Sequence, residues 1–258
     1  MNFFEEVSFE DKATAAGALH AAIARSKVVC LRDVPPSLDR DRFYQDIARH
    51  TGHFHFKNED PHTGRLDQDG WLDMRYRAEL ADTIPYRYGN GRMGLHIDGA
   101  YTDISFDLIF FYCERQAQYG GATTVIDSSL LIDYLRCCDP DLLHQLSTAP
   151  VLFGKGEKQR RSLILDLQPA CPVFNWNANR VSSDNPPAIL QMTQRFDAFC
   201  ERQLVDGGLM TPVLLAPGES LFIHNRLVLH GRTSFWGARC LMKGAISLAR
   251  EALPHGSA

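Results

Sequence analysis

Hydrophobic and polar positions follow two different periods along this chain of 258 residues, and they separate a helical opening from a β-rich remainder. Residues 11–26 are rich in alanine with one apolar face, which predicts a helix. Val28–Leu31 is a short apolar run of strand length, and a Pro-Pro-Ser sequence at 35–37 then introduces a second helix over 38–50. We expect this opening, residues 1–50, to be a helical flank of the β-rich core.

Residues 51–94 show no clear period and are dense in glycine, aspartate, histidine and arginine. A loop of this length inside a compact domain usually has a binding role. We therefore expect 51–94 to be a lid or binding loop over a site that the following residues build.

After residue 99 the pattern is mostly that of strands. Leu108–Tyr112 is continuously apolar and 122–126 is rich in β-branched residues, as is typical of strands. Serine or proline residues, which are typical of the first positions of a helix, predict helices over 130–138, 140–146 and 187–205. Further strands are expected near 151–153, 162–167, 173–176, 210–215, 220–224, 227–230 and 240–249.

Many strands with a few covering helices predict a mainly β fold with flanking helices, in which a jelly-roll barrel is closed by helices on one face. The length is sufficient for one undivided domain over residues 1–258. The helices at about 128–205 would then form an insert in that domain.

The composition, with 45% hydrophobic and 22% charged residues, is that of an ordinary globular protein. The net charge of −4 argues against non-specific binding to nucleic acid. No apolar run is long enough to cross a membrane, and the acidic start lacks the basic residues of a signal peptide. Seven cysteines without a Cys-x-x-Cys pair are interpreted as buried free thiols. We therefore expect a cytoplasmic protein with no nucleic-acid or membrane partner.

The candidate chemistry is a metal site formed by His96, Asp98 and His230. Residues two apart on a strand point to the same side, so His96 and Asp98 can offer an imidazole nitrogen and a carboxylate oxygen to one metal. His230 would complete a 2-His-1-carboxylate facial triad, which leaves three positions open on Fe(II). His53 and His55 have the same spacing but no carboxylate nearby, and we interpret that pair as structural.

Two cations near the end of the chain indicate a second ligand beside the metal. Arg239 and Lys243 are four residues apart on a predicted strand, so both project from one face. Buried charges need partners of opposite sign. If this face is the barrel interior, the site is expected to hold an anionic cosubstrate.

Taken in order, His96-x-Asp98, Gly120-Gly-Ala-Thr123, His230-Gly-Arg and Arg239-x-x-x-Lys243 resemble the motifs of the taurine dioxygenase and clavaminate synthase superfamily. The resemblance covers residues 28–249, and the compact length is most similar to the carbapenem synthase branch. It implies a double-stranded β-helix core and an oxygenase that depends on Fe(II), 2-oxoglutarate and O₂. Such enzymes typically hydroxylate a substrate while releasing succinate and CO₂; desaturation, cyclisation and epimerisation are variants. The resemblance is also compatible with a homodimer.

The resemblance identifies the facial triad as the iron site and implies roles for residues around it. Arg239 would pair with the distal carboxylate of 2-oxoglutarate, assisted by Thr123 or by its neighbour Thr124. Lys243 stands where relatives often carry an arginine that holds an anionic substrate group. Asp98, in place of glycine or alanine, argues against a halogenase.

Three features depart from the superfamily pattern, and the first is Lys243 itself, which is a point charge and not a bidentate arginine. His224-Asn-Arg226 replaces the usual Asp-Asn-Arg before the last ligand, and we interpret His224 as structural. The short spacing from His230 to Arg239 leaves Arg232 as a second candidate for binding the cosubstrate carboxylate.

Arginines and aromatic residues before His96 are expected to wall the mouth of the site, and these are Arg75, Arg77, Arg92, Trp71, Tyr86 and Tyr88. This mixture suits a small carboxylate-bearing metabolite, an amino acid or a natural-product intermediate, with an unactivated C–H bond to be hydroxylated. Arg92 and Lys243 are the candidate substrate-binding residues. Two alternatives stay open: a cupin-like metal enzyme that does not use 2-oxoglutarate, and a non-catalytic jelly-roll binding module.

Overall fold

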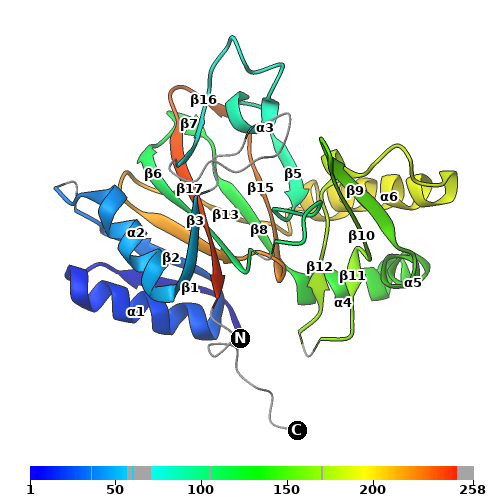
Figure 1. Cartoon of the computed structure of the whole chain (residues 1–258), viewed down its shortest axis with the longest axis horizontal. Coiled ribbons are helices and arrows are strands. Elements are labelled where there is room, and N and C mark those ends of the chain that lie inside the picture. The colour runs from blue at the N-terminus through cyan, green and yellow to red at the C-terminus, as the bar shows by residue number, and fades with distance from the viewer. Residues whose placement is uncertain (36, 57–59, 61–70, 105, 170, 249–258) are drawn as a thin grey trace, which may run out of the picture.

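The computed structural model describes the chain except for residues 36, 57–59, 61–70, 105, 170 and 249–258. Two large sheets face each other at its centre (Figure 1). The larger sheet has seven strands, in the order β1 (Asn2–Ser8), β2 (Ser26–Arg32), β14 (Ser220–His224), β6 (Leu108–Arg115), β17 (Cys240–Leu248) and β3 (Gly52–Phe56), with β4 (Leu72–Arg75) also paired to β17. The smaller sheet has the order β13 (Thr211–Val213), β8 (Thr123–Asp127), β15 (Val228–Arg232) and β5 (Met93–His96).

Apolar side chains fill the space between the two sheets. Ile109, Phe111 and Cys113 of β6 point into this space, whereas Phe110 and Tyr112 point to the opposite face of the larger sheet. The two-residue period of a strand produces this division when both faces are buried. The mainly β fold with flanking helices and a jelly-roll core, predicted from the sequence, is confirmed.

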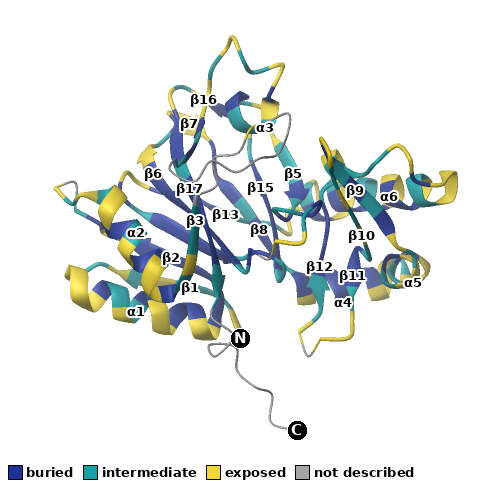
Figure 2. Ribbon diagram, viewed as in Figure 1, coloured by how far each residue is buried: buried dark blue, intermediate teal, exposed yellow. Residues whose placement is uncertain are grey.

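Helices cover both outer sides of this core, so the expectation of helices on one face is wrong. α1 (Lys12–Arg25) and α2 (Arg40–Thr51) pack on the larger sheet. The smaller sheet is covered by α4 (Ser128–Cys138), α5 (Pro140–Thr148) and α6 (Pro187–Phe199), the last continuing as a π-helical segment, Cys200–Val205 (Figures 1 and 2). Each sheet has an apolar outer face, and each of these faces is buried by its own set of helices.

The insert between β8 and β13 also carries short strands and a 3₁₀ turn. They are the hairpin β9 (Val151–Lys155) and β10 (Lys158–Ser162), the pair β11 (Leu165–Asp166) and β12 (Val173–Phe174), and η1 (Ala178–Arg180). The strand predicted over 162–167 is therefore divided between the end of β10 and β11. Trp176, which is fully buried, packs among the helices of the insert.

The start of the chain is part of the core and not only a helical flank. β2 lies inside the larger sheet between β14 and β1, and β1, an edge strand that the pattern did not predict, pairs parallel to it. Residues 51–94 likewise contain β3, β4, α3 (Pro85–Tyr88) and β5, so their described part is not the continuous loop that we expected. Residues 57–59 and 61–70 of that predicted loop lie outside the described residues.

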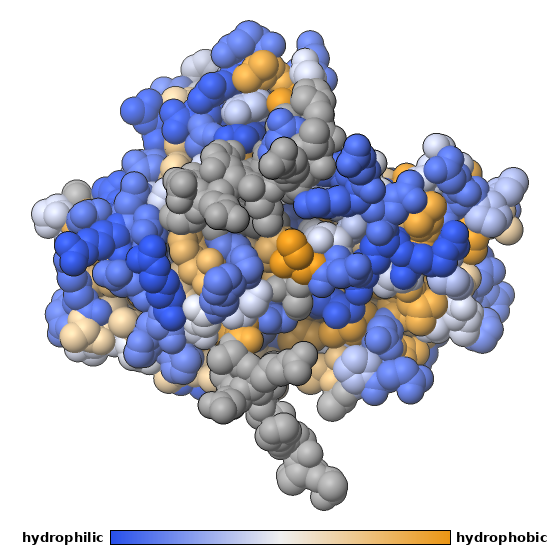
Figure 3. Space-filling view, viewed as in Figure 1, coloured by the Kyte–Doolittle hydropathy of each residue, from blue (hydrophilic) through white to orange (hydrophobic). Residues whose placement is uncertain are grey.

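Surface properties agree in part with the composition. The face seen in Figure 3 is mostly hydrophilic, and none of the helices in the described ranges has the length and apolarity needed to cross a membrane. All seven cysteines are free thiols. Cys137, Cys138 and Cys171 are exposed, however, so the expectation that every thiol is buried is wrong for these three.

Candidate metal centre

Strand pairing brings His96 and His230 together from distant parts of the sequence. His96 is the last residue of β5 and lies directly opposite His230 of β15. Side chains of directly opposed residues leave the same face of a sheet, with Cβ atoms about 4.5–5.5 Å apart. The centroids of the two imidazole rings are 4.3 Å apart. Both rings therefore face one point between the sheets.

Asp98 reaches the same point from a turn and not, as expected, from the strand that carries His96. β5 ends at His96, and the turn that follows contains Gly99 with a positive φ of 74°. The side chain of Asn225 accepts a hydrogen bond from the backbone N–H of Asp98 and donates one to its carbonyl, each at 2.9 Å. Asn225 is thus a positioning residue that sequence reasoning missed, although it stood in the His224-Asn-Arg226 motif.

The three side chains offer a donor set that fits Fe(II). One ligand atom from each of His96, Asp98 and His230 lies within 4.8 Å of the other two, and Asp98 Oδ1 is 4.0 Å from His96 Nε2. Two imidazoles and one carboxylate are the ligands of the facial triad of non-haem iron oxygenases.

The surroundings of His96 prepare it for metal binding. Its Nδ1 lies 2.9 Å from the carbonyl oxygen of Gly94, so Nδ1–H donates to that oxygen and Nε2 is left for the metal. Burial lowers the pKa of His96, Asp98 opposes this shift, and the charges of Lys243 and Arg180 add to it. A lowered pKa keeps the imidazole neutral, which is the form that binds a metal.

An inner cavity extends from the triad into the space between the sheets. Its polar lining consists of His96, Thr123, His230, Arg232, Arg239 and Lys243. Arg239 and Lys243 are both buried, so neither faces solvent, and Arg239 lies just before β17 where the pairing with β6 shifts register. The structure thus places next to the triad the two cations that the sequence grouped on one face.

Two of these cations are buried arginines without a carboxylate partner among the described residues. Arg239 donates from Nε to the carbonyl of Gly121 at 3.1 Å, and its Nη1 has no hydrogen-bond partner in the described part of the chain. Arg232 donates from Nη2 to the carbonyls of Gly89 and Gly91, at 3.0 and 2.7 Å. Burial lowers the pKa of each guanidinium to about 10, and for Arg239 the charge of Arg232 contributes. Unused N–H groups on adjacent buried cations constitute a site for an anionic ligand.

The glycine pair before β8 makes room for Arg239. Gly120 and Gly121 have φ values of 68° and 77°, and a Cβ on Gly121 would lie 3.0 Å from Cδ of Arg239. In β8, Thr123 faces the inner cavity, whereas Thr124 lies on the opposite side of the strand. Of the two threonines that the resemblance left open, Thr123 is therefore the one beside Arg239.

Lys243 stands between the inner cavity and a second, outer cavity, because it lines both. Its Nζ lies 2.5 Å from Oδ2 of Asp98, and the two side chains are 6% and 14% exposed. The lysine charge is therefore paired with a metal ligand in this structure.

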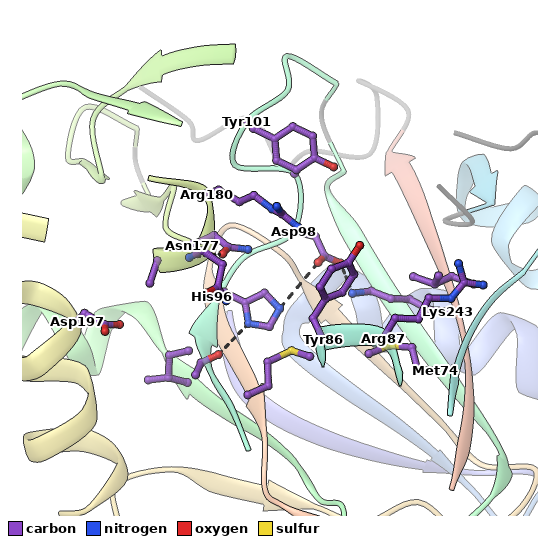
Figure 4. Close-up of a pocket in the computed structure, with 17 residues that line it drawn as sticks. Met74, Tyr86, Arg87, His96, Asp98, Tyr101, Asn177, Arg180, Asp197 and Lys243 are labelled. Atoms are coloured by element: carbon purple, nitrogen blue, oxygen red, sulfur yellow. Dashed lines mark hydrogen bonds and ion pairs between the residues drawn. The ribbon is translucent and has the colours of Figure 1, made fainter. Parts of the chain in front are cut away.

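The outer cavity opens on the other side of the triad and has a volume of about 100 Å³ (Figure 4). Its polar and aromatic lining includes His96, Asp98, Tyr86, Arg87, Tyr101, Asn177, Arg180 and Asp197. Pockets that hold drug-sized ligands measure about 300–1,000 Å³. The outer cavity is therefore sized for a small molecule.

Most residues predicted to wall the mouth lie elsewhere, and of the six only Tyr86 lines the outer cavity. Trp71 packs against Phe110 and Tyr112 on the helix-covered face of the larger sheet. Tyr88 is buried and has the guanidinium of Arg77 at 5.1 Å from its ring centroid.

The arginines of that prediction are engaged in ion pairs. Arg75 and Arg77 both pair with Asp73. Arg92, a predicted substrate-binding residue, pairs with Glu201 and is not part of the cavity lining. The arginines that do line the outer cavity, Arg87 and Arg180, were missed, because nothing in their sequence neighbourhood distinguishes them from surface arginines.

Two further histidine sites lie apart from the triad, in agreement with their structural interpretation. His224 contacts the carbonyl oxygen of Ile23 through Nε2 at 2.9 Å. His53 is exposed, and His55 contacts Oγ of Ser247 at 2.9 Å. In the described part of the chain, the triad is the only group of three or more such side chains with metal-ligand spacing.

Comparison with known proteins agrees with this geometry. The bovine (Bos taurus) mitochondrial trimethyllysine dioxygenase is 26% identical over 161 residues, which cover 57% of this chain and 38% of the relative. A uridine-5'-phosphate dioxygenase from Amycolatopsis sp is 29% identical over 176 residues, covering 62% of this chain and 61% of the relative. This chain therefore spans less than two thirds of the length of either relative.

Among solved structures, an asparagine oxygenase in complex with Fe(II), 2S,3S-3-hydroxyasparagine and succinate superposes with a TM-score of 0.70. It is 15% identical, and the superposition covers 92% of this chain and 79% of that one. The model of the taurine catabolism dioxygenase TauD, TfdA family matches residues 3–246. The chain therefore belongs to this family of dioxygenases.

Proposed function

We propose that this protein is an Fe(II)- and 2-oxoglutarate-dependent oxygenase that hydroxylates a small carboxylate-bearing metabolite. The observation that carries the proposal is the position of the triad between two cavities of different chemistry. The inner cavity has buried arginines with unused N–H groups, whereas the outer cavity is lined by Tyr86, Tyr101 and Arg180. His96 lines both cavities, so a metal on this residue would be accessible from both sides.

The residues that would hold the cofactors follow from this arrangement. His96 would bind iron through Nε2, together with Asp98 and His230. Arg239 would bind the distal carboxylate of 2-oxoglutarate, assisted by Thr123. When bound, iron and cosubstrate supply the oxidising chemistry, in which O₂ and 2-oxoglutarate are consumed, succinate and CO₂ are released, and a substrate C–H bond is hydroxylated.

The chain itself contributes positioning and exclusion of water. Met74, Phe111 and Leu241 give the inner cavity apolar walls, so few groups other than the cations can bind a polar ligand there. The inner cavity measures about 20 Å³ in this structure. Binding of the cosubstrate therefore requires lining side chains to change rotamer, as is common on ligand binding.

The small size of the outer cavity and the nature of the relatives support a small metabolite as substrate. The names of the relatives indicate trimethyllysine and uridine-5'-phosphate as substrates, and the superposed structure holds a hydroxylated asparagine. Two of these three are amino acids, and we propose an amino acid or a similar carboxylate. The homodimer, the cytoplasmic location and the carbapenem synthase-like branch stay predictions.

Succinate formation tests the proposal. Protein loaded with Fe(II) is incubated with O₂, 2-oxoglutarate and one candidate metabolite at a time, and succinate is quantified. We expect succinate release that a substrate stimulates and that Arg239→Ala reduces strongly. Activity without 2-oxoglutarate that Arg239→Ala does not change would favour the cupin-like alternative, and no turnover or metal binding would favour the binding module.

A further inference from the structure

Arg180 lines the outer cavity and forms no ion pair within the described part of the chain. Arg180 ends η1 in the insert, and its guanidinium extends toward Asp98, below the ring of Tyr101 (Figure 4). Arg180 lines the outer cavity together with His96 and Asp98. Arg180 nevertheless has no carboxylate within ion-pairing distance among the described residues.

The other cations around the cavity differ from Arg180 in this respect. Lys243 is paired with Asp98 at 2.5 Å, and Arg87 with Asp73 at 2.5 Å. Asp197 lines the cavity too, but its carboxylate lies apart from the guanidinium of Arg180 and forms no ion pair with it (Figure 4). An arginine directed into a small cavity without an acidic neighbour is suited to a ligand that brings the negative charge.

Two aromatic rings hold the guanidinium in place. Its Cζ lies 5.5 Å from the ring centroid of Tyr86 and 5.6 Å from that of Tyr101. Cation–π contacts at this distance are attractive and leave the N–H groups available. Tyr86 comes from α3 and Tyr101 from the segment after β5, so elements from three parts of the chain meet around Arg180.

We propose that Arg180 binds the carboxylate of the substrate and thereby positions the substrate over the triad. This inference rests on the proposed function and specifies its substrate side. It assigns to Arg180 the role that the sequence gave to Arg92 and Lys243. The planar guanidinium can donate two parallel hydrogen bonds to a carboxylate, which fixes orientation as well as affinity. A phosphate monoester offers related chemistry, but the volume of about 100 Å³ favours the smaller carboxylates.

Ligand binding to the anaerobic complex of the protein with Fe(II) and 2-oxoglutarate tests this proposal without turnover. The probes are the common L-amino acids and short-chain carboxylic acids, each with its primary amide and, where one exists, its phosphate monoester. Binding is followed by calorimetry and by the change in the visible absorption of the iron–cosubstrate complex. We expect at least one carboxylate to bind and its amide to bind at least tenfold more weakly.

Three variants separate Arg180 from a general charge effect. Arg180→Gln should weaken carboxylate binding by about tenfold to one-hundredfold, the range for charge-assisted hydrogen bonds. Arg180→Lys should recover part of the loss. Arg161→Gln removes the same charge from an exposed position on β10 and should leave binding unchanged.

The outcomes that overturn the inference differ from those that overturn the proposed function. Unchanged carboxylate binding by Arg180→Gln, tighter binding of a phosphate monoester, or no binding of any carboxylate at millimolar concentration would each contradict the role of Arg180. In all three cases the visible absorption of the iron–cosubstrate complex would still form. Absence of that absorption in wild-type protein would contradict the proposed function itself.

Discussion

The inner and outer cavities meet at the triad, but they are built from different parts of the fold. The inner cavity is lined from β8, β15 and β17, whose register fixes where Thr123, His230 and Arg239 lie. The outer cavity shares strand residues of β4, β5 and β17 with the inner cavity, but the rest of its lining comes from α3, the turn after β5, η1 and α6, which are short or belong to the insert. The cosubstrate side is thus a property of the barrel, whereas the substrate side is a property of this chain's insert and connections.

Removing a ligand at the junction should produce the largest effect, because both cavities depend on the metal. We expect His230→Ala to lose bound iron and to reduce 2-oxoglutarate turnover by more than the 10–100-fold that loss of a ligand's supporting hydrogen bond costs. Iron content by metal analysis and succinate release check this. His224→Ala removes a histidine outside the triad and should retain iron; similar losses in both variants would mean that the effect is not specific to the triad.

A change confined to the inner cavity should affect only the cosubstrate. Arg239→Gln is expected to raise the KM for 2-oxoglutarate by about 10–100-fold, because it removes charge-assisted hydrogen bonds to a carboxylate. The KM for the organic substrate should change little. Steady-state kinetics with each substrate varied in turn measure both constants. A rise in the KM for the organic substrate alone would contradict the assignment of separate ligands to the two cavities.

Lys243 lines both cavities, and its pairing with Asp98 can be tested by measuring the free energy of unfolding. Lys243→Met removes the cation that pairs with the largely buried carboxylate of Asp98, so the free energy of unfolding of the metal-free protein should fall by up to about 3 kcal/mol. A divalent metal supplies the missing positive charge, and adding Mn(II) should therefore stabilise the variant more than the wild type. Urea unfolding with and without Mn(II) measures this, with the exposed Lys12→Met as control. An equal loss with and without metal would contradict the pairing.

The smallest effect is expected at the rim of the outer cavity. Arg92 is 46% exposed at its side chain and pairs with Glu201 outside the lining. Exposed ion pairs contribute about 0–1 kcal/mol, so Arg92→Gln should change the KM for the organic substrate by no more than about twofold. A tenfold increase in this KM would indicate that Arg92 binds the substrate and would weaken the assignment of Arg180.

The sequence predicted the part of the site that strand geometry determines. His96 and Asp98 were grouped by their spacing, and Arg239 and Lys243 by theirs, because short separations on or near strands translate directly into shared direction. The ordered motifs then connected these pairs with His230. The same reasoning could not place Asn225. Its role depends on the turn after β5, which its side chain holds by hydrogen bonds to the backbone of Asp98.

The substrate side was mostly beyond prediction, for a physical reason. Trp71 and Tyr86 lie in the same polar segment, yet one packs on the larger sheet and the other lines the outer cavity. An aromatic residue in the core and one that lines a cavity can be of the same residue type. Only long-range packing distinguishes them. Arg180 belongs to an insert without a motif, and β1 was missed because the sequence of Asn2–Ser8 does not alternate between apolar and polar residues.

The most direct test of the central claim is anaerobic titration of the Fe(II) protein with 2-oxoglutarate, followed by visible metal-to-ligand charge-transfer absorption. We predict a band in the wild type, no band in His96→Ala, and a band in Arg239→Gln only at about 10–100-fold higher 2-oxoglutarate. Wild-type protein that binds one equivalent of Fe(II) but shows no band at saturating 2-oxoglutarate would contradict the account.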